Sequence, residues 1–292
     1  MKKTIITLLA FFIIGNMDTS AQNRPNQYLA DKKYYEVIDN WVMFHKSDTS
    51  YVYGFVYLDE SAGFTIHFEG DFKIDRNGLF VKNNPLKNRI LKERLSSESI
   101  LFTVIPQEKI KELNLPEKPD WLDIYKIDKN TIQYLYSLGH AFNAAGESAL
   151  AIEPLSKAYS KKPNYKGLGF ELAYAFNATE EYEKAASVLG RAIKNDPKNF
   201  YLYRELGYAF CGLQKLEEAE SVYQECLLLT DDNRVWCEVG INMVQAYYYA
   251  DNKEKFEKWY KYTKQYADPK SEIYKYLELY RVEMDKRGLK SR

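Results

Sequence analysis

Apolar positions in residues 131–269 follow helical spacing and return every 34 residues. Within one copy they lie on one face of each of two helices: Leu172, Ala173 and Phe176 on the first, and Ala185, Leu189 and Ala192 on the second. A polar break at 177–181 separates the two helices, and Asn195-Asp196-Pro197 ends the second. One such hairpin cannot bury its apolar face alone, so the pattern predicts a stack of helical hairpins.

The same columns recur in the neighbouring copies. Two columns are bulky and two are small: Leu138, Leu172 and Leu206; Phe142, Phe176 and Phe210; Gly139, Ala173 and Gly207; Ala151, Ala185 and Ala219. Small residues let paired helices approach closely, while the bulky residues fill the seam between them. With Pro163 and Pro197 near the ends of two copies, the pattern resembles the tetratricopeptide repeat (TPR) family over residues 132–233. The resemblance implies an α-α superhelical solenoid that binds other proteins.

The array extends past its clearest copies. We expect about four TPR hairpins over 131–269 and a capping helix with a tail over 270–292. The fourth unit keeps the helical spacing but drifts by about three residues. Pro154 lies inside the second helix of the first unit, where it removes a backbone donor. We therefore expect that helix to kink or to begin late.

Residues 22–130 do not repeat, and their apolar period changes to two. Two alternating runs predict strands: Tyr51, Tyr53, Phe55 and Tyr57 in one, and Phe64, Ile66 and Phe68 in the other. Glu60–Gly63 separates them as a hairpin loop, and the apolar run Ile100–Ile105 adds another strand. Asn77-Gly78 predicts a tight turn that places Ile74 opposite Val81. The region is thus expected to be a small antiparallel sheet of about four strands.

Three short helices complete this expectation. Asp31–Phe44 is predicted as a helix running into Trp41. Two proline-bounded segments, Gln107–Leu113 and Pro119–Tyr125, are predicted as helices that dock the β-rich region onto the first repeat. The fold class is therefore α+β, predominantly α, with a small antiparallel β-rich N-terminal region before the helical solenoid.

The first 21 residues have the features of a signal peptide. Lys2 and Lys3 precede the apolar run Ile5–Gly15, and the small residues Thr19-Ser20-Ala21 offer a cleavage site. A membrane-spanning helix needs roughly 20 apolar residues, about twice the length of this run. The sequence predicts an exported protein, periplasmic or secreted, with no transmembrane segment after cleavage.

The net charge of the chain bears on the class of partner that it binds. Removing residues 1–21 takes away Lys2, Lys3 and Asp18, which leaves 39 basic and 40 acidic residues. A balance so close to neutral gives no reason to expect nucleic acid as a partner.

The three cysteines, Cys211, Cys226 and Cys237, are interpreted as small apolar helix residues, with a Cys226–Cys237 disulfide as the alternative.

Candidate chemistry is sparse. His67 lies with Thr65 and Glu69 on the polar side of a predicted strand, where a His–Glu pair could perform acid–base work. A solvated strand face gives the same neighbours, and this interpretation is favoured. No metal-ligand spacing, phosphate-binding loop or serine elbow is visible, so we expect a non-catalytic protein without metal or cofactor.

The TPR resemblance also implies which residues line the concave surface. Carried over column by column, they are Tyr136, Phe170 and Arg204; His140, Tyr174 and Tyr208; and Asn143, Asn177 and Cys211. All of these except Cys211 are predicted ligand-binding residues. Their aromatic faces, donors and acceptors suit an extended peptide or a helix, and the expected function is an interaction scaffold. The alternatives are an envelope carbohydrate-binding protein that uses the same aromatic groove, and an enzyme centred on His67 and Glu69.

Overall fold

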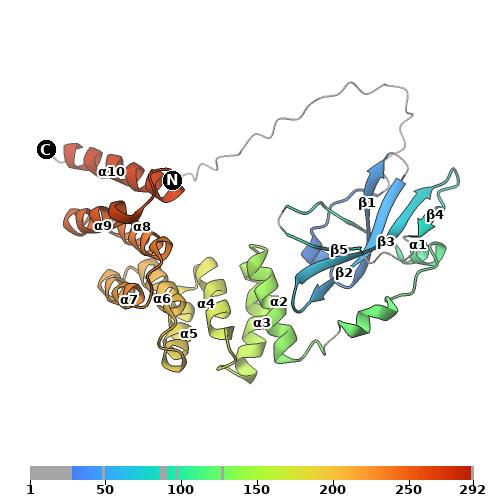
Figure 1. Cartoon of the computed structure of the whole chain (residues 1–292), viewed down its shortest axis with the longest axis horizontal. Helices are drawn as coiled ribbons and strands as arrows, with labels where there is room; N and C mark the ends of the chain where they lie inside the picture. The colour runs from blue at the N-terminus through green and yellow to red at the C-terminus, as the bar shows by residue number, and fades with distance from the viewer. Residues whose placement is uncertain (1–27, 48–49, 86–90, 97, 126–127, 291–292) are drawn as a thin grey trace.

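A computed structural model of the chain describes residues 28–47, 50–85, 91–96, 98–125 and 128–290. An antiparallel sheet is followed by helical hairpins arranged side by side in a curved row that leads away from it (Figure 1). The predicted fold class is confirmed: a β-rich N-terminal region precedes a predominantly helical array. The predicted signal peptide lies outside the described residues.

The sheet contains six strands in the described part of the chain. They are β1 (Asn40–Ser47), β2 (Ser50–Asp59), β3 (Gly63–Ile74), β4 (Phe80–Pro85), β5 (Leu91–Arg94) and β6 (Thr103–Val104). The order is β4-β3-β2-β1-β6. Strand β5 also pairs with β3: it pairs with residues 65–68, whereas β4 pairs with residues 70–74. The loop predicted at Glu60–Gly63 does connect two strands, since β2 ends at Asp59 and β3 begins at Gly63.

The helix predicted over Asp31–Phe44 is wrong. The structure has a single 3-10 turn there, η1 (Tyr34–Glu36), and residues 40–44 belong to β1. The reason is tertiary: Val42 and Met43 are fully buried between β2 and β6, with one residue toward each face of the sheet. Pairing with neighbouring strands outweighs the local helical signal.

The register of the β3–β4 hairpin differs from the prediction by one residue. Ile74 pairs with Phe80, and Lys73 pairs with Val81. Residues 75–79 form the turn, which is longer than a two-residue loop. The Asp75 carboxylate stabilises it by accepting hydrogen bonds from the backbone N–H groups of Asn77 and Leu79. A shift of one residue exchanges the two faces of a strand, so Phe80 is buried and Val81 is exposed.

Both faces of the sheet are covered. The Tyr and Phe residues at 51, 53, 55 and 57 in β2 lie on one face, where α1 (Gln107–Glu112) and η2 (Asp120–Ile124) pack. Phe64, Ile66 and Phe68 of β3 face the other side, because Phe55 pairs with His67 and Val56 with Ile66. That side is covered by η1 and by the first helix of the array.

This arrangement corrects the predicted docking. The short helices at 107–112 and 120–124 exist, but they cover the face of the sheet that is turned away from the repeats. Contact with the array is made directly by α2 (Ile132–Ala144), whose Phe142 ring lies 5.4 Å from that of Phe64. The Tyr35 hydroxyl adds a hydrogen bond to the Glu147 carboxylate.

The array is built from helical hairpins that repeat along the chain. After α2 come α3 (Ser148–Lys161), α4 (Leu168–Ala178), α5 (Tyr182–Asn195), α6 (Phe200–Gly212) and α7 (Leu216–Leu228). The second helices of the first three hairpins begin at residues 148, 182 and 216, at the predicted 34-residue period. The small columns lie where the two helices of a hairpin cross. At Gly139 of α2, for example, an added Cβ atom would come within 2.3 Å of the Leu155 side chain of α3, so there is no room for a larger residue.

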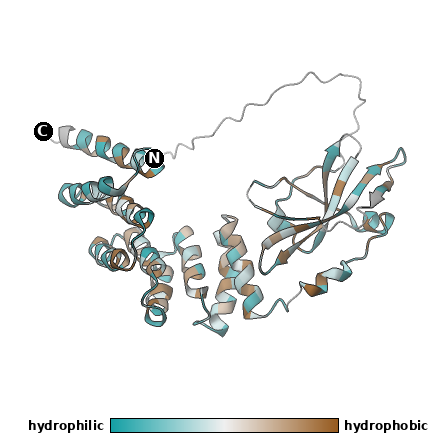
Figure 2. Ribbon diagram, viewed as in Figure 1, coloured by the Kyte–Doolittle hydropathy of each residue, from teal (hydrophilic) through white to brown (hydrophobic). Residues whose placement is uncertain are grey.

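The fourth hairpin and the cap depart from the period. Helix α8 (Asn233–Tyr249) has 17 residues against 13 in α6, so α9 (Lys253–Tyr266) begins three residues later than the period requires. The predicted drift is thus one extra turn at the end of α8. The cap is α10 (Glu272–Lys290), which buries Leu277 and Met284. In Figure 2 the helices α9 and α10 are mostly teal, with apolar residues in patches.

Two further expectations are decided by the array. Helix α3 begins at Ser148 and continues through Pro154, so the late start is wrong, while the kink stays a prediction. Ala151, Leu155 and Ala158 are buried on either side of the proline. All three cysteines are free. Cys226 is buried and its thiol points to the carbonyl oxygen of Phe200, which agrees with the apolar interpretation and not with the disulfide.

Candidate functional site

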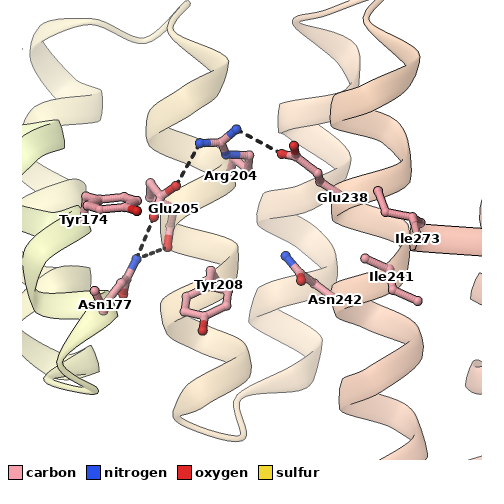
Figure 3. A pocket seen from close by; sticks show the side chains of 10 residues that line it. Tyr174, Asn177, Arg204, Glu205, Tyr208, Glu238, Ile241, Asn242 and Ile273 are labelled. Atoms are coloured by element: carbon pink, nitrogen blue, oxygen red, sulfur yellow. Dashed lines mark hydrogen bonds and ion pairs between the residues drawn. The ribbon is translucent and has the colours of Figure 1, made fainter. Parts of the chain in front are cut away.

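A groove of about 450 Å³ lies between the first helices of the last three hairpins and the cap (Figure 3). Its lining comes from α4, α6, α8 and α10: Tyr174, Asn177, Ala178, Arg204, Glu205, Tyr208, Glu238, Ile241, Asn242 and Ile273. Four of the eight predicted ligand-binding residues are therefore brought together at one place. The prediction that they bind a ligand stays a prediction.

Two tyrosines give this groove its aromatic surface. Tyr174 and Tyr208 are 39% and 42% exposed, although Leu172, Phe176 and Leu206 in the same helices are buried. They occupy the same column of consecutive repeats, since they are separated by one 34-residue period. Tyr174 stacks on Phe170 and Tyr208 meets Tyr182 edge-on, and the exposed part of each side chain is open to a ligand.

Arg204 is the cation among the groove residues, and its charge is already paired. Its Nη1 donates to Glu238 Oε2 at 3.0 Å and its Nη2 to Glu205 Oε1 at 3.1 Å (Figure 3). Burial lowers the pKa of Arg204, but the two carboxylates outweigh it, and the pKa lies above its usual value. The pairing joins α6 to α8 across the groove.

Asn177 has a structural role that the sequence did not indicate. Its amide nitrogen donates to the carbonyl oxygen of Glu205 at 3.0 Å and to its carboxylate at 3.1 Å. Asn143 makes the same pair of bonds to Glu171 in the preceding repeat. Both asparagines are buried, at 3% and 8% exposure, so their amide nitrogens connect adjacent hairpins and do not face solvent as expected.

The third copy of this junction is apolar. One period after Asn177 the chain has Cys211, and one period after Glu205 it has Val239. Both members of the polar pair are replaced together, and the Cys211 sulfur lies 3.8 Å from the sulfur of Met243. Replacing both partners avoids the cost of leaving one buried polar group unpaired.

The other predicted residues lie elsewhere. His140 lines a separate pocket of about 220 Å³ between the first hairpin and the sheet, and its Nδ1 is 2.8 Å from Glu171 Oε1. Phe170 lines a pocket of about 310 Å³ at the ends of α3 and α5. Tyr136 packs on Tyr165, with ring centres 5.4 Å apart. The predicted strip is thus divided among several sites.

Sequence reasoning missed six of the ten residues that line the groove. Glu238 and Asn242 follow Arg204 and Tyr208 by one period, so strict application of the repeat would have found them. The assumed drift of the fourth unit hid them, because the extra turn of α8 comes after these positions. Ile273 belongs to the cap, which has no repeat column to identify it.

The His67 and Glu69 pair is covered by the segment that follows the sheet. His67 is 9% exposed, with its ring 4.3 Å from that of Trp121, and Glu69 accepts a hydrogen bond from the Trp121 indole at 3.0 Å. Burial lowers the pKa of His67. The solvated strand face expected here is wrong, because η2 packs on it.

The described residues contain neither a metal-binding cluster nor a helix suited to cross a membrane. No group of three or more His, Cys, Asp or Glu side chains among them could hold a metal ion. None of the helices in the described ranges combines the length and the apolar character needed to cross a membrane.

Solved structures similar to the chain include helical proteins of low sequence identity, named MamA. No protein-family model matches the chain, and no curated protein matches it. Among solved structures, a crystal structure of MamA is 21% identical, with a TM-score of 0.42, over 50% of this chain and 84% of that one. MamA from Desulfovibrio magneticus RS-1, residues 41 to the end, is 20% identical with a TM-score of 0.42, over 55% and 83%. Similarity at this level assigns no function to the chain.

Proposed function

We propose that the chain is an exported, non-catalytic interaction protein that holds a peptide or a helix in the groove between α4, α6, α8 and α10. The proposal rests on the groove itself, which combines two half-exposed tyrosines with apolar Ile241 and Ile273 and with polar groups from three successive repeats. Aromatic anchors and an apolar groove are features by which proteins commonly recognise peptides and helices.

The spacing of the groove supports an elongated ligand. Tyr174, Tyr208 and Asn242 occupy one column of three consecutive hairpins, so a ligand that contacts all three must follow the row of helices. A compact ligand would reach one repeat. An extended peptide or a helix has the length to reach three.

The test is capture of exported proteins on the immobilised chain. We expect at least one captured protein to be lost when Tyr174→Ala is combined with Tyr208→Ala. The matched control is Leu150→Ala with Leu228→Ala, which removes two exposed apolar side chains outside the groove and should retain the partner. Retention of every captured protein by the tyrosine variant would contradict the proposal, and saturable binding of glycans instead would favour a carbohydrate ligand.

Export is a separate part of the proposal. It rests on the charge, length and small residues of 1–21. Deletion of these residues should leave the protein inside the cell, and N-terminal sequencing of the exported form should begin at Gln22. An exported form that still begins at Met1 would contradict cleavage.

A further inference from the structure

We infer that the groove between α4, α6, α8 and α10 recognises a peptide through a basic side chain, a lysine or an arginine. This inference rests on the proposed groove binding and adds the chemical class of the ligand. It follows from the charges of the groove, from its unused acceptors and from the position of its aromatic rings.

The charges come first. The charged side chains that line the groove are Arg204, Glu205 and Glu238, which sum to one negative charge. Arg204 is bonded to both carboxylates, and its side chain is 21% exposed. An anionic ligand would find the charge of Arg204 already neutralised and would be repelled by the exposed carboxylate of Glu238. A cationic ligand would be attracted to that carboxylate.

Glu238 is the carboxylate that a ligand can reach. Its side chain is 46% exposed, whereas that of Glu205 is 10% exposed. Arg204 contacts Oε2 of Glu238. Among the described residues no hydrogen bond to the other oxygen of this exposed carboxylate is found, and Asn242 follows one turn later on the same helix (Figure 3). A charge-assisted hydrogen bond at this position would be stronger than one between neutral groups.

The hydrogen-bonding groups show the same bias. The amide nitrogen of Asn177 donates to Glu205, and that of Asn242 donates to the Tyr223 hydroxyl. The oxygen of Asn177 has no partner among the described residues, although the residue is 97% buried. A buried acceptor without a donor is costly. That oxygen is itself buried, so a ligand meets instead the exposed carboxylate of Glu238, to which an ammonium or guanidinium group brings donors and a positive charge.

The aromatic rings add attraction for a cation. Tyr174 on α4, Tyr208 on α6 and Glu238 on α8 come from neighbouring helices of the same groove (Figure 3). A cation within about 6 Å of a tyrosine ring centre is attracted to the ring face. Ile241 and Ile273 provide the apolar part of the lining. The fitting ligand is a peptide with a basic residue next to an apolar one.

The test is selection of short random peptides displayed in a library on the purified full-length chain. We expect the selected peptides to be enriched in Lys or Arg beside an apolar residue. Replacing that basic residue by norleucine or citrulline should weaken the best synthetic peptide by about tenfold, as loss of one charge-assisted contact would. Binding should also weaken with added salt, because salt screens exposed charges.

The matched variants are Glu238→Gln and Glu225→Gln. Both remove one negative charge, but Glu225 is an exposed residue of α7 outside the groove. We expect Glu238→Gln to lower affinity by about tenfold and Glu225→Gln to leave it unchanged. Melting curves of both variants check that the fold is retained.

The remaining outcomes separate the two proposals. Peptides that require Tyr174 and Tyr208, but show no basic preference and bind Glu238→Gln equally well, would overturn this inference and leave groove binding intact. Peptides enriched in Asp or Glu would also overturn it. Selection of no peptide that depends on the two tyrosines would overturn both.

Discussion

The sheet and the helical array are stabilised in different ways. In the sheet, Trp41, Phe55 and Trp121 come from distant segments and meet in one core between β1, β2 and η2. In the array, each helix packs mainly on the next, and the same columns fill each seam. A mutation in the sheet should therefore affect a whole core, whereas one in the array should act mainly on one junction.

The largest effect is expected in the sheet. Phe55 is fully buried against the rings of Trp41 and Trp121, so Phe55→Ala should lower the free energy of unfolding by about 3–5 kcal/mol. Urea unfolding followed by tryptophan fluorescence measures this loss. If the helical signal in circular dichroism fell at the same lowered midpoint, the two regions would unfold as one unit and the comparison would be wrong.

The next effect belongs to the array and depends on pH. Burial raises the pKa of Glu220, but hydrogen bonds from Lys255, Lys258 and Tyr247 outweigh it and hold the pKa at about 2. A lowered carboxyl pKa stabilises the fold at neutral pH, and this stability is lost as the pH falls from 4.5 toward about 2. The loss should be about 3 kcal/mol.

The matched variant for this prediction is Glu220→Gln. It should be less stable at neutral pH, and its stability should change less between pH 4.5 and about 2 than that of the original chain. Thermal melts across this range make the measurement. Parallel curves for the two proteins would show that Glu220 does not carry the dependence.

Overpacking one helix crossing should cost less. Ala185 is fully buried where α4 and α5 meet, so Ala185→Leu should cost about 1–3 kcal/mol. Ser187→Leu is the control, since it enlarges an exposed position of the same helix. An unchanged melting temperature for Ala185→Leu would contradict the helix-pair register.

The polar junction between α4 and α6 gives a sharper test of locality. Asn177→Ala leaves buried groups of Glu205 without their donor and should cost about 1–2 kcal/mol. The double change Asn177→Cys with Glu205→Val copies the apolar junction formed by Cys211 and Val239 and should recover most of this loss. A double variant less stable than the single one would show that the junctions are not interchangeable.

The smallest effect tests the sheet register. Val81 is 49% exposed, so Val81→Thr should change stability by about 0.5 kcal/mol or less. Phe80 is buried and stacks on Phe72, and Phe80→Ala should cost several times more. Equal costs at the two positions would restore the register in which Val81 lies opposite Ile74.

The sequence determined the features that repeat over short distances. The 34-residue period located the hairpins, their small columns and the tyrosine column, because helical spacing and close crossings need residues of defined size at fixed intervals. It also located Tyr174, Asn177, Arg204 and Tyr208 in the groove, through the columns of the repeat.

Only the tertiary structure decided what depends on distant partners. It placed the aromatic runs of β2 and β3 on opposite faces of the sheet, covered His67 with Trp121, and balanced Arg204 with two carboxylates. A residue pattern shows which side chains share a face, but it does not show which element covers that face. It also cannot show whether a charge is already paired, since an ion pair depends on side chains from separate helices. For this reason the sequence indicated a groove, and only the structure showed how the charges in it are paired.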